Sequence, residues 1–189
     1  MIRGLVIATL LAAPAFAEGE YSEGSEAKAW NVAGEEKARF SGTVVDVLCD
    51  LTGDCPADCG AGTRQLAIRR SADDKLILVS KNAQAAFTGA ARELAPFCGQ
   101  EVEVDGNLVG DPELTQTKFY QVQKIRAVGA DEWVSANRWT KVWNEQNPDQ
   151  AKVKGAWYRK DPLINAQIEA EGYLGLGLEA DETFIADWF

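Results

Sequence analysis

The stretch at residues 40–49, FSGTVVDVLC, sets the expected fold class of this chain. Its richness in valine and other β-branched residues favours a strand. Residues 64–69, RQLAIR, alternate between apolar and polar side chains and predict a second strand. Residues 71–74, SADD, predict a turn into a third strand at residues 75–80, KLILVS. The chain from residue 40 onward is therefore expected to begin as a strand followed by a β-hairpin.

One helix and two more strands complete this predicted unit. The helix spans residues 82–94, because its apolar side chains recur at helical spacing. These side chains are Ala83, Phe87, Ala90, Ala91 and Leu94. Residues 101–105 and 119–128 predict the last two strands, joined by a long turn-rich connection. A change of phase along the last strand predicts a β-bulge near Gln123 or Lys124.

The N-terminus has the parts of an export signal in the right order. A short positive stub ends at Arg3, an apolar run covers residues 4–13, and Ala15-Phe16-Ala17 forms a small-x-small cleavage site. These features predict a Sec-type signal peptide at residues 1–17, cleaved after Ala17. We therefore expect a protein of the bacterial periplasm. Residues 18–38 are small, polar and charged, and are expected to form a flexible arm before the folded unit.

The order strand, strand, strand, helix, strand, strand is that of a five-stranded OB-fold barrel. A signal peptide followed by one such barrel resembles the small periplasmic OB-fold proteins of bacteria, over residues 40–128. This resemblance implies a mainly β fold at residues 39–129 that acts as a binding module, and it carries over no functional residue. A small β-sandwich or an open sheet is the alternative architecture.

The composition excludes several classes of function. The net charge is −10, so nucleic acid and anionic lipid are expected to repel the chain. After the N-terminal run, no stretch is long and apolar enough to predict membrane insertion. The chain contains no histidine, and its single methionine is Met1. These absences exclude His-based acid–base catalysis, Ser–His and Cys–His nucleophile pairs, and His/Met ligation of haem or copper. We therefore expect a noncatalytic protein, although catalysis by carboxylates alone stays open.

Four cysteines are expected to form disulfides, because their number is even and the chain is predicted to be exported. Three lie within residues 49–62, CDLTGDCPADCGAG, and the set is Cys49, Cys55, Cys59 and Cys98. In the barrel the fourth strand pairs with the first, which makes Cys49–Cys98 together with Cys55–Cys59 a natural arrangement. The spacing itself leaves all three connectivities open. Iron–sulfur or zinc thiolate sites and redox-active thiols are the alternatives, although the spacings match no established motif.

Acidic side chains occupy two connections that would lie at the binding rim of an OB fold, residues 50–63 and 107–116. They are Asp50, Asp54, Asp58, Asp111 and Glu113. Clustered carboxylates attract basic protein surfaces and are the ligands that calcium prefers. We therefore expect an acidic rim that binds a cation or a basic partner. No cofactor is expected, although calcium is possible at this rim.

Residues 130–189 are expected to form a helical, tryptophan-rich extension packed on the barrel. Trp133, Ala136, Trp139, Val142 and Trp143 recur at helical spacing, and the helix is predicted to end before Asn147-Pro148. Asp161-Pro162 is expected to begin another helix, which Gly172 closes. Residues 173–178 are too rich in glycine to assign. Asp181 is expected to cap a last helical turn. Four tryptophans, Trp133, Trp139, Trp143 and Trp157, are candidates either for an internal core or for a partner surface.

These observations favour a disulfide-stabilised, noncatalytic binding or accessory module. It would recognise another periplasmic protein, a small ligand or a cation through its acidic loops and its tryptophan-rich tail. The alternative is a periplasmic protein that uses its cysteines for electron transfer or metal handling.

Overall fold

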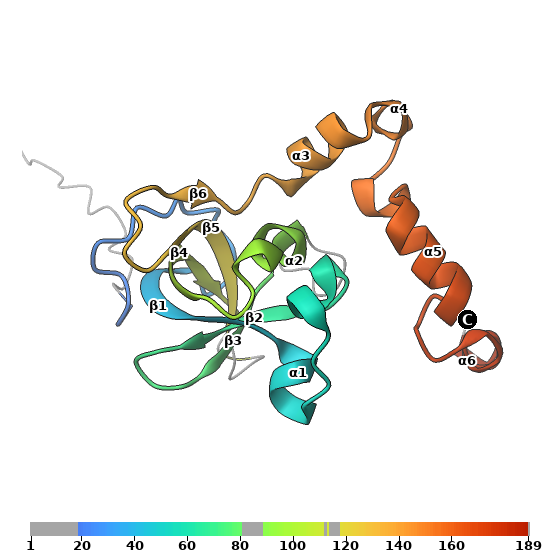
Figure 1. Cartoon of the computed structure of the whole chain (residues 1–189), viewed down its shortest axis with the longest axis horizontal. Helices are drawn as coiled ribbons and strands as arrows, with labels where there is room; N and C mark the ends of the chain where they lie inside the picture. The colour runs from blue at the N-terminus through green and yellow to red at the C-terminus, as the bar shows by residue number, and fades with distance from the viewer. Residues whose placement is uncertain (1–18, 81–88, 112, 114–117, 189) are drawn as a thin grey trace, which may run out of the picture.

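The computed structural model describes residues 19–80, 89–111, 113 and 118–188. The predicted signal peptide and the first part of the predicted helix, residues 82–88, lie outside these ranges. The centre of the fold is a mainly antiparallel β-sheet, and most of the helices follow it in the chain (Figure 1).

Six strands form the sheet in the order β3-β2-β1-β4-β5-β6. They are β1 (Glu36–Asp46), β2 (Leu66–Arg70), β3 (Leu76–Leu78), β4 (Glu101–Val109), β5 (Phe119–Ala127) and β6 (Val134–Ser135). The α-helices are α1 (Val47–Thr52), α2 (Gly89–Leu94), α3 (Trp139–Gln146), α4 (Pro148–Ala151), α5 (Pro162–Glu171) and α6 (Leu178–Trp188). Three short 3-10 helices are η1 (Ala57–Gly62), η2 (Ala95–Phe97) and η3 (Trp157–Arg159).

Strand β1 is the organising element of the sheet. Every second side chain along it is buried, which is the alternation expected of a strand with one face on the core. Its first part pairs with β4, from Glu36 opposite Leu108 onward, and its last part pairs with β2, up to Asp46 opposite Leu66. Gly42 lies in the middle, where a Cβ would meet the carbonyl oxygen of Arg69 at 2.5 Å. A side chain at this position would therefore force β1 and β2 apart.

The sheet is open, so the expectation of a closed five-stranded barrel is wrong. Strand β3 is short, and an isolated parallel bridge between Val79 and Tyr120 joins the chain just after it to β5. Beside this bridge the amide of Ser80 donates to the carbonyl of Tyr120 at 3.0 Å. The rest of that edge of β5 pairs with the sixth strand, β6, through Lys124 and Ile125. The helical spacing that starts at Trp133 predicts a helix at these residues, so the local pattern does not reveal the pairing of β6.

The predicted bulge in the last strand is confirmed. Asp105 pairs with Lys124, whereas the adjacent Gly106 pairs with Val122, so Gln123 is the extra residue. The bulge reverses which side chains of β5 face the core, and Tyr120, Val122 and Ile125 are all buried. The phase change in the sequence therefore reflects a real change of register.

The main apolar core lies between the curved sheet and α2. Its fully buried members include Val44, Leu66, Ile68, Leu94, Val102, Val104, Tyr120 and Ile125. The hydroxyl of Tyr120 donates to the carbonyl of Ala38 at 2.7 Å, which provides the partner that a buried phenol needs. Burial raises the pKa of Tyr120 well above its ordinary value.

The N-terminal arm is bound to the sheet along most of its described length. The carboxylate of Asp105 accepts hydrogen bonds from the Ser25 hydroxyl at 2.5 Å and from the Glu26 amide at 2.9 Å. The amide of Lys28 donates to the side chain of Gln123 at 3.0 Å. These contacts use polar side chains on the face of β4 and β5 that points away from the core. The arm expected to be flexible is therefore anchored, and β1 begins at Glu36 rather than at residue 39.

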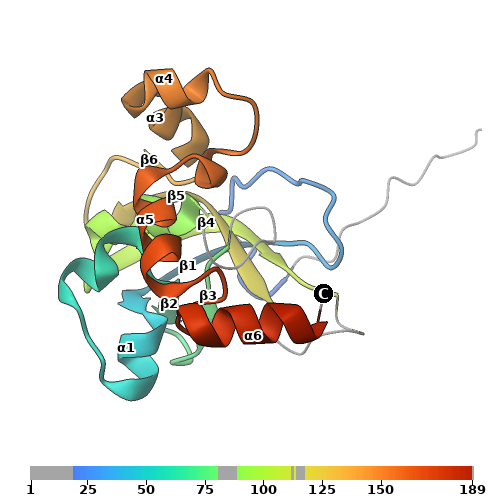
Figure 2. The same cartoon turned by 90° about the vertical axis from the view of Figure 1, so that its right-hand side faces the viewer.

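The helical extension has its own small core. Trp143, Trp157 and Ile164 are buried together, and Trp139, Tyr158 and Ile168 pack around them. The helices α3 to α6 follow one another along one side of the molecule (Figures 1 and 2). Helix α3 contacts α2 of the main body. The expected tryptophan helix begins at Trp139 rather than at Trp133, because β6 precedes it.

Candidate functional site

All four cysteines form disulfides, as expected, but the pairing differs from the arrangement that the barrel favoured. The bonds are Cys49–Cys55 and Cys59–Cys98. After Asp46 the chain turns into α1, because the Asp46 carboxylate accepts the amides of Leu48 and Cys49. This turn directs Cys49 toward its own loop.

Cys59, in contrast, is 5% exposed and belongs to the main core. Because all four sulfurs are bonded in pairs, the thiolate metal site considered from the spacing is not formed. Two disulfides are typical of a protein in an oxidising, secreted compartment.

The acidic residues of the cysteine loop are paired with nearby arginines. The Asp50 carboxylate accepts two hydrogen bonds from Arg69. The Asp54 carboxylate forms an ion pair with Arg64 at 2.8 Å. Asp58 is exposed. The hydrogen bond that Arg64 donates to Asp54 raises the pKa of Arg64, so this guanidinium keeps its charge. The loop is therefore not a concentrated negative surface.

The two acidic connections do not share a rim. One follows Asp46 at the end of β1, and the other follows Val109, beside the start of β1 at Glu36. The 11 residues of β1 separate them. Asp111 accepts the amide of Glu113 within its own turn. In the described ranges, no three acidic or cysteine side chains are grouped so that they could hold a metal ion. The expected acidic rim is therefore not assembled, because the register of β1 places its two halves apart.

Two of the four tryptophan candidates lie in the core of the extension. Trp143 is 1% exposed, and its indole N–H donates to the carboxylate of Asp161 at 2.6 Å. Trp157 is also buried, with Trp139 packed edge-to-face against it. The same Asp161 carboxylate caps α5 by accepting the amides of Leu163 and Ile164, which confirms the predicted cap. These tryptophans therefore hold the helices together.

Trp133 packs on the outer face of the sheet. The guanidinium groups of Arg126 and Arg39 lie 4.4 and 5.2 Å from the centre of its ring. Both arginines also bind Glu103. Burial raises the pKa of Glu103, but the hydrogen bonds from Arg126 and Arg39 outweigh it and lower that pKa below its ordinary value. Half-buried Trp133 therefore covers a network of charged side chains, separate from the tryptophan core of the extension.

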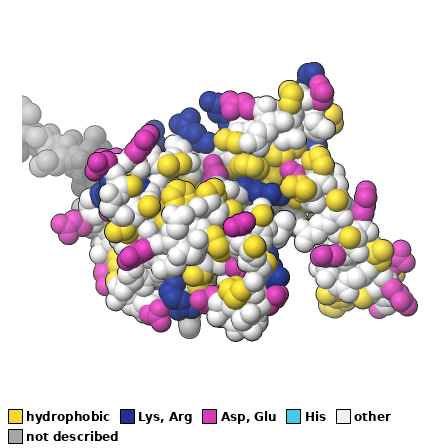
Figure 3. Space-filling model, in the orientation of Figure 1, with side chains coloured by type: hydrophobic (Ala, Val, Ile, Leu, Met, Phe, Trp, Pro, Cys, Tyr) yellow, Lys and Arg dark blue, Asp and Glu magenta, His cyan; other side chains and the backbone are white. Residues whose placement is uncertain are grey.

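Exposed apolar side chains gather instead at the C-terminal end, in residues 173–188, which we call the C-terminal segment. They are Tyr173, Leu174, Leu176, Leu178, Phe184, Ile185 and Trp188. Trp188 is 71% exposed, and its ring stacks on that of Phe184 with centroids 5.6 Å apart. Figure 3 shows the lobe that contains α6 as a mixture of hydrophobic and acidic side chains. Exposing such large apolar side chains to water does not stabilise the isolated chain, so this surface is a candidate binding site.

Asp181 gives the C-terminal segment a defined shape. Its buried carboxylate accepts the amide of Leu174 at 2.6 Å and that of Leu176 at 3.0 Å. Gly172 lies at the entry with a φ of +88°, and a Cβ there would meet an Asp181 oxygen at 2.2 Å. The sequence predicts that Asp181 caps the start of the last helix, but α6 begins earlier, at Leu178. Asp181 instead holds the preceding loop onto the side of α6. The sequence signal for this loop is its alternation of leucine and glycine in residues 174–178.

The C-terminal segment is also strongly acidic. No lysine or arginine follows Lys160 in the chain. Glu179, Glu182 and Asp187 are exposed in the segment, and Glu169 and Glu171 are exposed just before it. The carboxylates of Asp161 and Asp181 are buried. An apolar surface edged only by carboxylates selects partners by charge as well as by shape.

Comparisons with known proteins found no relatives. No protein-family model, no curated protein and no solved structure matches this chain. In the described part of the chain, no helix has both the length and the apolar character needed to span a membrane.

Proposed function

We propose that this protein is a noncatalytic binding module that docks on a partner protein through the C-terminal segment. The observation that carries the proposal is the group of exposed, ordered apolar side chains on α6 and the loop before it, led by Trp188 at 71% exposure. Large aromatic side chains contribute most of the binding energy in many protein interfaces.

The chemistry of the segment specifies the partner. Phe184 and Trp188 lie one helical turn apart and form a stacked pair that suits an apolar groove. The acidic side chains around them suit a groove edged by lysine and arginine. Anionic lipid is the other apolar target available in a cell envelope, but a segment without one cationic side chain would be repelled by it.

The Asp181 contacts favour tight docking. They fix the loop and the helix relative to each other before the partner arrives. A segment that is already ordered loses less conformational entropy on binding than a flexible tail does. The Asp161–Trp143 contact similarly fixes the start of α5, which leads into the segment.

We further propose that the module works in the bacterial periplasm and that its open sheet is a variant of the OB fold. The predicted signal peptide and the two disulfides support the location. The order of the first five strands, with α2 between β3 and β4, and the parallel bridge at Val79–Tyr120 support the OB-like interpretation.

Site-specific photo-cross-linking in the periplasm of the source bacterium tests the docking proposal. A photoreactive amino acid at Trp188 should cross-link to one dominant protein. The same group at Leu51, a residue that is 68% exposed on α1, serves as the matched control. The proposal predicts a product from position 188 that is lost in a chain carrying Phe184→Ser. Equal products from both positions, or cross-linking of position 188 to lipid alone, would refute it.

A further inference from the structure

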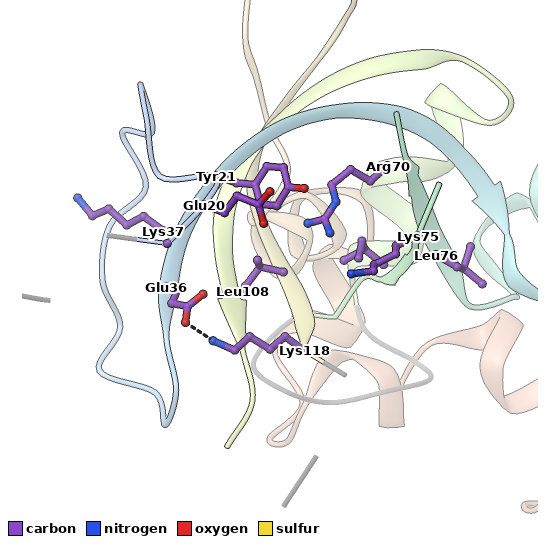
Figure 4. Close-up of a pocket in the computed structure, with 11 residues that line it drawn as sticks. Glu20, Tyr21, Glu36, Lys37, Arg70, Lys75, Leu76, Leu108 and Lys118 are labelled. Atoms are coloured by element: carbon purple, nitrogen blue, oxygen red, sulfur yellow. Dashed lines mark ion pairs between the residues drawn. The ribbon is translucent and has the colours of Figure 1, made fainter. Parts of the chain in front are cut away.

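A second candidate site lies far from the C-terminal segment, at the mouth of the open sheet. A pocket of about 420 Å³ opens where β1 starts, β4 ends and the β2–β3 hairpin turns. Its apolar floor includes Leu76, Ile77 and Leu108. A pocket of this size accepts a small organic molecule. Charged side chains of both signs surround the floor (Figure 4).

Arg70 is the distinctive group in this pocket. Its side chain is only 6% exposed, and its guanidinium lies 4.0 Å from the centre of the Tyr21 ring. Asp73 accepts two hydrogen bonds from it, one from Nε and one from a terminal nitrogen. A guanidinium has five N–H groups, and among the described residues no other acceptor is bound by Arg70. A buried guanidinium with unused donors at a cavity is suited to bind a carboxylate.

Two lysines add further positive charge around the pocket. Lys75 is 69% exposed and contacts Asp73 at 3.3 Å. Lys118 lies on the opposite side of the pocket and pairs with Glu36 at 2.5 Å (Figure 4). Each lysine is therefore held at the pocket by a carboxylate.

Glu20 supplies the opposite charge. It lines the pocket from the N-terminal arm. The hydrogen bonds that Arg70 donates to Asp73 raise the pKa of Arg70 most, and the negative charge of Glu20 raises it further. Within the described part of the chain, no cation forms a direct ion pair with Glu20. Glu20 and Glu36 line the pocket, and Asp73 pairs with Arg70 and Lys75 beside it. Three carboxylates therefore accompany three cations, the third of which is Lys118. A simple anion would be attracted by the donors and repelled by the acids, whereas a molecule with both charges can satisfy each side.

We propose that this pocket binds a small zwitterion with an apolar body, of the class of amino acids and short peptides. The ligand carboxylate lies against Arg70 and Lys75, and its ammonium group lies against Glu20. Its apolar side chains cover the apolar floor of the pocket. This site is independent of the C-terminal segment, so either proposal can fail without the other.

Isothermal titration calorimetry with the mature-length protein tests the proposal. The probes are the dipeptide leucyl-leucine, its N-acetyl derivative, which lacks the ammonium group, and leucyl-leucinamide, which lacks the carboxylate. The dipeptide should bind at least about 10-fold more tightly than either derivative, a difference of about 1.4 kcal/mol. Equal binding of the N-acetyl derivative would show an anion site and overturn the proposal, as would the absence of binding by all three probes.

Three substitutions locate the binding in the pocket. Glu20→Gln should remove the preference for the free ammonium group, and Lys75→Gln should weaken the dipeptide more than the amide. Lys37→Gln is the matched control, because Lys37 is exposed at the edge of the pocket and points away from its centre (Figure 4). A control variant that weakens binding as much as the other two would contradict the assigned contacts.

Discussion

The two disulfides should contribute unequally to stability, and removing each pair with alanine separates them. Cys59–Cys98 links residues 39 positions apart, whereas Cys49–Cys55 links residues 6 positions apart. In the chain-entropy account a cross-link stabilises by restricting the unfolded chain, by about 4 kcal/mol for the longer loop and about 2 kcal/mol for the shorter one. Cys59 is also buried in the main core, so its replacement leaves a small cavity that costs about 1 kcal/mol more.

Urea unfolding followed by circular dichroism in the β-sheet region measures this difference. Cys59→Ala with Cys98→Ala should lower the free energy of unfolding by about 5 kcal/mol, and Cys49→Ala with Cys55→Ala by about 2 kcal/mol. Alanine is preferable to serine at Cys59, because a buried hydroxyl without a partner would add its own penalty. If the Cys49–Cys55 pair cost as much as the other, the assigned connectivity or the burial of Cys59 would be wrong.

Three further outcomes follow from single side chains. Tyr120→Phe removes the hydrogen bond to the carbonyl of Ala38 and should cost about 1–2 kcal/mol in the same urea assay. Asp161→Ala should reduce the near-ultraviolet circular dichroism of the tryptophans, because Trp143 loses its acceptor and α5 its cap, while amide exchange in the sheet stays unchanged. Two arginines lower the pKa of Glu103, so Glu103 stabilises the fold above the ordinary carboxyl pKa, and this stabilisation is lost as the pH falls through the folded-state pKa. Glu103→Gln should therefore flatten the acid limb of a plot of stability against pH.

Local patterns predicted the parts of the fold that local physics determines. The strands, the bulge at Gln123 and the cap at Asp161 each depend on a few neighbouring residues, and the structure contains them. The pairing of the cysteines depends instead on the direction in which α1 leaves β1, which no spacing encodes. Strand β6 has only two residues and forms because the edge of β5 is available.

The candidate site was less predictable than the fold. Tryptophans at helical spacing suit a core and a binding surface equally, and only the packing of Trp143 against Trp157 separates these roles. The acidic loops looked like one rim because the sequence does not show that β1 separates them. The loop before α6 could not be assigned, because its shape depends on a contact from Asp181, which follows it in the chain.

The affinity of the cross-linked partner for purified variants tests the central claim most directly. Trp188→Ala should weaken binding by at least about 30-fold, or about 2 kcal/mol, as expected for an aromatic hot spot. Binding should also weaken as salt rises through the physiological range, because the proposed partner groove is basic and salt screens its attraction to the carboxylates around the segment. Leu51→Ala, at a similarly exposed site on α1, should leave the affinity unchanged. Equal affinities for the wild-type chain and Trp188→Ala would contradict the assignment of binding to the C-terminal segment.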